Sequence, residues 1–205
     1  MLPLRAAFLL TVCSLAASAD WLIAGPLERG SRLPLNADSG LAMFAGVSDP
    51  AAPKAGDALG PATWEAATPD ADGVIENAKL NGGGAYTCVT SASDRVAVAA
   101  VRGASAFYVN GEPFVGDVYD QGFVRIPIPL RKGDNHVYLR VARGRVAFRV
   151  EDPPAPLYLI AKDATLPDRV GGVPAGKWGA IPIANATLET VRDATLEYGN
   201  VRAPL

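Results

Sequence analysis

Four residues in one expected loop have side chains that could bind a ligand. Asp117, Tyr119, Asp120 and Gln121 place carboxylate and amide groups beside an aromatic ring. A sugar-binding loop needs hydrogen-bonding groups for hydroxyls and a flat apolar face for the ring. Any solvated loop also contains such residues. The pattern therefore leaves two interpretations open, a carbohydrate-binding loop and an ordinary polar connection.

The tryptophans Trp21, Trp64 and Trp178 are further candidates for a sugar platform. Trp21 stands in an apolar strand-like stretch, which favours a place in the core. Trp64 lies in an irregular stretch and is the best platform candidate of the three. Anchoring of that stretch to the body of the protein is the favoured alternative for Trp64.

No combination of residues in the chain predicts a catalytic centre or a cofactor. His136 is the only histidine, and the stretch 103–107 lacks the second glycine of a Gly-x-Ser-x-Gly motif. A zinc site needs three or four nitrogen or sulfur ligands, more than one histidine and one cysteine provide. No pair of carboxylates has a spacing that indicates glycosidase chemistry. We therefore predict no catalytic residue, no metal and no cofactor, and an exposed or rim position for His136.

Four arginines, Arg140, Arg143, Arg145 and Arg149, fall on two successive expected strands. Such a group is typical of a solvated face of a sheet. It also fits an interface to a missing domain or a site for an anion. The sequence leaves these three interpretations open.

The ends of the chain predict export. Residues 1–19 combine Arg5, a short apolar run and a small-residue cleavage site, as in a secretory signal peptide. No other apolar run could span a membrane. The net charge is −2 and becomes more negative when Arg5 is removed, which gives no reason to expect a nucleic-acid partner. Cys88 would be the only cysteine left, expected as a buried apolar residue, and we expect a bacterial periplasmic or secreted protein.

The elements that must position these residues are short strands separated by turns. Residues 107–141 read as strand, Asn-Gly turn, strand, loop, strand, Lys-Gly turn and strand, which we interpret as a β-meander. The run 96–101 is apolar at every position, so we expect it to be covered on both faces. Prolines between Glu28 and Asp72 predict a long irregular excursion with room for one short helical turn.

This pattern predicts an all-β protein with one main domain over residues 20–152. A proline-rich linker at 153–156 follows. Residues 157–205 contain a few further strands, too few to bury a core alone. We interpret them as an incomplete second β-sandwich, Ig-like, so the chain is expected to be the front part of a longer protein.

Three stretches resemble the galactose-binding-like jelly-roll domains of exported bacterial proteins. Trp21-Leu-Ile-Ala-Gly-Pro-Leu27 is similar to their opening, with Leu27 where phenylalanine is commoner. Phe107-Tyr-Val-Asn-Gly-Glu112 resembles their hairpin, and residues 130–141 resemble the strand that follows. The resemblance covers roughly residues 21–152. Relatives that bind calcium or sugar often have carboxylates before the hairpin, whereas here the corresponding residues are Arg102-Gly-Ala-Ser105, so the resemblance does not imply a metal site.

The resemblance implies a non-catalytic jelly-roll β-sandwich, an accessory module of the kind attached to secreted hydrolases and peptidases. The expected partners are a carbohydrate or a missing C-terminal domain. An N-terminal portion of an exported α/β-hydrolase-type peptidase or esterase is the first alternative. A structural envelope or interaction protein is the second.

Overall fold

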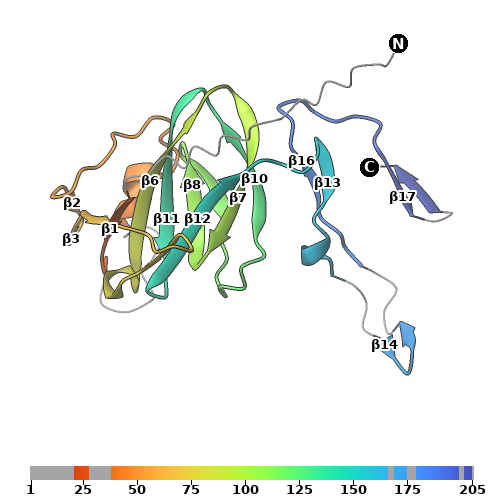
Figure 1. The fold of residues 1–205 in the computed structure, drawn as a ribbon, viewed down its shortest axis with the longest axis horizontal. Helices are drawn as coiled ribbons and strands as arrows, with labels where there is room; N and C mark the ends of the chain where they lie inside the picture. The colour runs from red at the N-terminus through yellow and green to blue at the C-terminus, as the bar shows by residue number, and fades with distance from the viewer. Residues whose placement is uncertain (1–20, 28–37, 166–168, 175–178, 199–200, 205) are drawn as a thin grey trace, which may run out of the picture.

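The computed structural model describes residues 21–27, 38–165, 169–174, 179–198 and 201–204. Its main body consists of two antiparallel sheets, which confirms the all-β prediction (Figure 1). The six-stranded sheet contains, in spatial order, β4 (Glu65–Ala67), β1 (Trp21–Ala24), β6 (Gly83–Ser91), β11 (Gly133–Val141), β8 (Ala104–Val109) and β9 (Glu112–Val115). The four-stranded sheet contains β10 (Arg125–Leu130), β7 (Arg95–Arg102), β12 (Arg145–Glu151) and β5 (Val74–Glu76). The expected signal peptide at 1–19 lies outside the described residues.

The pairing of the strands is nested around one tight turn. Strand β8 pairs with β9, β7 with β10, β6 with β11 and β5 with β12. The stretch from β5 to β12 therefore forms one long antiparallel hairpin that rolls up, so that successive pairs alternate between the two sheets. This double-sheet arrangement of eight strands is a jelly roll, as the sequence predicts.

The turn at the centre of this hairpin is Asn110–Gly111. Both residues have positive φ, 50° for Asn110 and 85° for Gly111. A two-residue hairpin turn that matches the twist of its strands requires this conformation, which asparagine and glycine adopt most easily. The prediction of a hairpin at this place is confirmed.

The predicted β-meander over residues 107–141 is wrong. Strand β10 pairs with β7 in the four-stranded sheet, whereas β9 and β11 belong to the six-stranded sheet. The Lys132–Gly133 turn thus carries the chain from one sheet to the other. A short turn with a glycine at positive φ, here 93° at Gly133, suits both kinds of connection, so the local sequence does not distinguish them.

Apolar side chains of both sheets, together with Leu80 from the turn before β6, fill the space between the sheets. The largest of these that are almost completely buried are Ile23, Leu80, Val101, Phe107, Ile128, Val137, Leu139, Val141 and Val146. Strand β7 is also covered on its other face, because Val98 and Ala100 are 3% and 5% exposed. This confirms the expectation for residues 97–101 of the apolar run, whereas Val96 at its start is half-buried.

The excursion between β1 and β5 folds over the outer face of the six-stranded sheet. It contains the short helix α1 (Ser39–Phe44) and the small hairpin of β2 (Ala58–Leu59) and β3 (Ala62–Thr63). The 3₁₀ turn η2 (Ala78–Leu80) follows β5. The ring of Phe44 stacks on Tyr138 with a centroid distance of 4.8 Å and an interplanar angle of 7°. A second apolar cluster forms there, made of Leu22, Ala24, Leu27, Phe44, Leu59, Trp64, Tyr86 and Tyr138.

Beyond residue 156 the described chain forms only two-stranded ladders. They pair β13 (Leu157–Leu159) with β16 (Ile183–Asn185), β14 (Arg169–Val170) with β15 (Val173–Pro174), and β17 (Thr195–Tyr198) with β18 (Val201–Pro204). The turn η3 (Ala161–Asp163) follows β13. Strand β16 contacts β10, whereas the β14–β15 hairpin extends away from the sandwich (Figure 1). Ala184 is the only buried side chain among those described in this segment. The segment expected to be an incomplete Ig-like sandwich therefore consists, in its described residues, of separate two-stranded ladders.

The part of the chain that the structure describes has no helix of the length and hydropathy needed to cross a membrane.

Candidate functional site

The loop between β9 and β10 contains the four ligand-binding candidates, and Asp117 determines its shape. Asp117 is 3% exposed, and its carboxylate accepts hydrogen bonds from the backbone N–H groups of Gln121, at 3.0 Å, and Gly122, at 2.7 Å. Asparagine and aspartate side chains stabilise turns by such local bonds. Asp117 therefore organises the loop and has little surface left for a ligand.

Tyr119 is the exposed aromatic residue of this loop. Its side chain is 72% exposed, and the guanidinium carbon of Arg143 lies 5.9 Å from the centre of its ring. A cation at this distance over an aromatic face is attracted to the ring. Gln121 is also exposed. Tyr119 and Gln121 are the two predicted ligand-binding residues that solvent reaches most freely.

Asp120 fastens the loop to the four-stranded sheet. Its carboxylate lies 3.0 Å from Nε of Arg102, at the end of β7, and 3.3 Å from Nε of Arg145, at the start of β12. The three side chains are partly exposed, so each pair contributes modestly to stability. Two pairs at one carboxylate nevertheless restrict where Tyr119 can move.

The site that results combines Tyr119, Gln121 and Asp120 with Arg102, Arg143 and Arg145. Arg102, Asp120 and Arg145 also line a small void next to it, which has no room for a water molecule. Sequence reasoning found Arg143 and Arg145 but missed Arg102. Its position at the polar end of an otherwise apolar strand is the signal that could have drawn attention to it.

Trp64 is not a sugar platform. Its side chain is completely buried in the second apolar cluster. The indole lies edge to face against Phe44, with ring centres 6.5 Å apart, and against Tyr86, at 6.3 Å. Its ring therefore anchors the excursion to the six-stranded sheet, which was the alternative interpretation. Trp178 lies outside the described residues, and Trp21 packs in the main core as expected.

The expected group of four arginines is divided between the two sheets. Arg140 is in β11, where its Nε lies 2.7 Å from the buried carboxylate of Asp38. Arg145 and Arg149 are in β12, and Arg143 lies in the connection between the two strands. The prediction of one cluster on two neighbouring strands is wrong because β11 and β12, although successive in the sequence, pair in different sheets.

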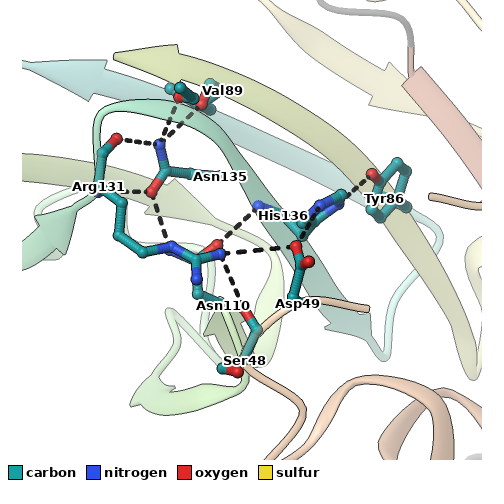
Figure 2. A network of polar contacts seen from close by, with 9 residues as sticks. Ser48, Asp49, Tyr86, Val89, Asn110, Arg131, Asn135 and His136 are labelled. Atoms are coloured by element: carbon teal, nitrogen blue, oxygen red, sulfur yellow. Dashed lines mark hydrogen bonds and ion pairs between the residues drawn. The ribbon is translucent and has the colours of Figure 1, made fainter. Parts of the chain in front are cut away.

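His136 belongs to a polar network at the end of the sandwich near the Asn110–Gly111 turn (Figure 2). Its Nδ1 lies 2.7 Å from the hydroxyl of Tyr86, and its Nε2 lies 3.8 Å from the carboxylate of Asp49. The ring is only 11% exposed, more buried than expected, because the excursion around Asp49 lies against it. Burial, with smaller contributions from Cys88 and Asp134, raises the pKa of Tyr86 well above its usual range. The Tyr86 phenol is therefore protonated. Through its contacts with Tyr86 and Asp49, His136 links the excursion to the six-stranded sheet.

Asn135 is the centre of the same network, and sequence reasoning missed it. Its side chain is completely buried, and its Nδ2 donates to the carbonyl oxygens of Val89, Arg131 and Gly133 at 2.9–3.1 Å. Its Oδ1 accepts from the backbone of Arg131 and from Asn110, both at 2.8 Å. Figure 2 shows how these bonds join the turn before β11 to the Asn110–Gly111 turn.

Cys88 is half-buried in β6, so it is more accessible than the expected core residue. Burial, together with the charge of Asp134, raises the pKa of its thiol, and the backbone N–H of Asn135 partly opposes this shift. Reactive thiols usually have a lowered pKa. The environment of Cys88 therefore does not favour nucleophilic chemistry.

Within the described ranges, no three histidine, cysteine, aspartate or glutamate side chains come together in a group that could hold a metal ion. Comparison of the chain with protein-family models, curated protein sequences and solved structures finds no match.

Proposed function

We propose that this protein is a non-catalytic, exported accessory module of the galactose-binding-like type that binds carbohydrate through the loop of residues 117–122. The observation that carries the proposal is the exposed ring of Tyr119 on a loop fixed by Asp117 and Asp120. A sugar ring is bound best by a flat apolar surface whose position is set before binding, because less conformational entropy is then lost.

Other features of the described residues support a binding module. The fold is a jelly roll, an architecture also found in lectin domains. The outer face of the six-stranded sheet is covered by the excursion, which leaves the loops and the long polar side chains on the four-stranded sheet as accessible surface. In the His136 network the hydroxyl belongs to Tyr86, which is 4% exposed, so a substrate has no direct path to it.

The proposal is tested with the purified full-length chain on a glycan array, followed by titration of the best ligand. Tyr119→Ala is expected to weaken binding roughly tenfold, because loss of one aromatic contact of about 1–1.5 kcal/mol has this effect. Val115→Ala is the matched control, since Val115 is 73% exposed on the neighbouring strand β9. It is expected to leave the affinity unchanged.

Two results would contradict the proposal. The first is the absence of binding to any glycan, which would favour a structural or interaction protein. The second is turnover of ester or peptide substrates that is lost in His136→Ala, which would identify a hydrolase.

A further inference from the structure

The outer face of the four-stranded sheet carries four arginines around small residues. Ala100 in β7 is the Cα partner of Arg125 in β10 and of Arg149 in β12. Partners in an antiparallel sheet point to the same face, and neighbouring strands are roughly 4.8 Å apart. Arg125 and Arg149 therefore stand on either side of Ala100. Arg102, two residues further along β7, lies on the same face because side chains alternate along a strand.

Strand β12 continues this face towards the loop that contains Tyr119. Arg145, Ala147 and Arg149 alternate with inward-facing residues, and Ala147 is the partner of Arg102. Two alanines thus form a low floor between the arginines. We call Arg102, Arg125, Arg145 and Arg149 the arginine face. Arg143, over the ring of Tyr119, lies at its edge.

The carboxylates near this face do not use all of its hydrogen-bond donors. Asp120 approaches Arg102 and Arg145 through their Nε atoms. The terminal nitrogens of these two guanidinium groups make no hydrogen bond with a described residue. Glu151 is 3.0 Å from Nε of Arg125, and the exposed Glu76 stands opposite Arg145 in the ladder.

Arg149 is the most available donor. Its side chain is exposed, and it forms neither a hydrogen bond nor an ion pair with any residue that the structure describes. Five arginines, counting Arg143, stand around the three carboxylates named here, Asp120, Glu151 and Glu76. The surface is locally basic although the chain as a whole has a net charge of −2.

We propose that the arginine face binds the acidic groups of an anionic polysaccharide, carboxylate or sulfate, while Tyr119 contacts one of its sugar rings. The inference rests on the proposed carbohydrate function and names the class of sugar. A guanidinium group presents parallel N–H donors that match a carboxylate or sulfate. Several such groups spread over three strands of one sheet face suit a polymer with repeated charges better than one small anion. A nucleic acid is also a polyanion, so a DNA duplex is included in the test as the competing ligand.

The test is a titration of the full-length chain with four polymers: a polyuronate, a sulfated polysaccharide, a neutral glucan and a DNA duplex. Binding to the polyuronate, the sulfated polysaccharide or both is expected, and the stronger one identifies the acidic group. Arg149→Gln should weaken this binding roughly tenfold, since it removes a charge-assisted contact. Raising the salt concentration from about 50 to about 200 mM should also weaken it.

Arg95→Gln is the matched control. It removes the same charge from the opposite end of β7, where Arg95 pairs with the exposed Asp152. It is expected to leave the affinity unchanged, and an equal loss in this variant would overturn the inference because the attraction would then be unspecific. DNA binding as tight as that of the acidic sugars would overturn it as well.

The outcomes separate this inference from the proposed function. Binding of the neutral glucan alone, reduced by Tyr119→Ala, would support carbohydrate recognition and overturn the acidic ligand. Absence of binding to all glycans would overturn both. Binding of an acidic polysaccharide that is unaffected by Arg149→Gln and by Arg145→Gln would overturn the assignment of the anion site to the arginine face.

Discussion

At the scale of single residues, Asn135 shows how one buried amide can hold several turns together. Its side-chain amide donates to the backbone carbonyls of Val89, Arg131 and Gly133. Any replacement that lacks the amide leaves these buried groups without hydrogen bonds, which is more costly than never having made the bonds.

Asn135→Ala is therefore expected to lower the free energy of unfolding by about 3 kcal/mol. Urea titration followed by tryptophan fluorescence measures the change. Asn81→Ala is the control, because the amide of the exposed Asn81 donates only to the carbonyl of Ala78. A loss of similar size in both variants would contradict the role given to Asn135.

The buried phenols of two tyrosines should make the free energy of unfolding depend on pH in the alkaline range. Burial raises the pKa of Tyr86 and Tyr138 above the ordinary value of 10.0. Above that pH the unfolded chain releases phenol protons that the folded chain retains, so the free energy of unfolding falls as pH rises. Each tyrosine contributes a slope of up to about 1.4 kcal/mol per pH unit.

Urea titrations at increasing pH, from neutral to above pH 10, measure this slope, and Tyr86→Phe is expected to reduce it by the contribution of one proton. Tyr119→Phe removes an exposed phenol and serves as the control. An unchanged slope in Tyr86→Phe would show that this phenol ionises equally well in the folded chain.

At the scale of elements, the contact of α1 with the six-stranded sheet depends on the absence of a side chain at Gly40. A Cβ atom at this position would overlap with the ring of Tyr138. The helix begins at the same point, where the carboxylate of Asp38 accepts from the N–H groups of Gly40, at 2.9 Å, and Leu41, at 3.1 Å. The close approach lets Phe44 stack on Tyr138.

Two effects of Gly40→Ala oppose each other, and their size decides the outcome. Helix propensity would stabilise the variant by roughly 1 kcal/mol. Overpacking against Tyr138 costs about 1–3 kcal/mol, and the collision involves a completely buried ring, so we expect net destabilisation. Thermal unfolding measures it, with the exposed Ala42→Ser as control. A more stable Gly40→Ala protein would show that the helix shifts easily on the sheet.

The sequence predicted most strands and the Asn110–Gly111 hairpin, because alternation and turn residues are local signals. It did not predict which sheet each strand joins. That choice depends on pairing between distant strands, as with β10 and β7. For Trp64 the sequence left two interpretations, a sugar platform and an anchor of the excursion. An irregular stretch has no periodicity that indicates which of its side chains are buried. The contacts of Asp120 with Arg102 and Arg145 also join distant positions, so the loop was found without its anchors.

At the scale of the whole molecule, the sandwich and the ladders beyond residue 156 differ in how much they bury. The core strands of the sandwich contain most of the buried apolar residues, whereas Ala184 is the only one described beyond the linker. Local opening requires less free energy where few apolar contacts are lost.

Hydrogen exchange measured by mass spectrometry is therefore expected to be slow in β6, β7, β11 and β12 and fast in β13 to β18. The small β2–β3 hairpin is an internal comparison. It is as short as the ladders but adjoins the buried Leu59 and Trp64, so its exchange is expected to be slower than theirs. Equally slow exchange beyond residue 156 would mean that this segment is packed against a surface, for example in an oligomer.

The nested pairing around Asn110–Gly111 also has a kinetic consequence. When β8 pairs with β9, the loop between them contains only Asn110 and Gly111. Each outer pair, such as β7 with β10, then has to close only the short connections to the pair inside it. Without the inner pair, β7 and β10 would have to meet across a long free loop, whose closure costs more entropy. Inserting glycines between Asn110 and Gly111 should therefore slow refolding after dilution from urea, while similar insertions in the exposed stretch around Gly56 should not. The strand pairs would then form in sequence, from β8–β9 at the innermost turn to β5–β12 at the outside.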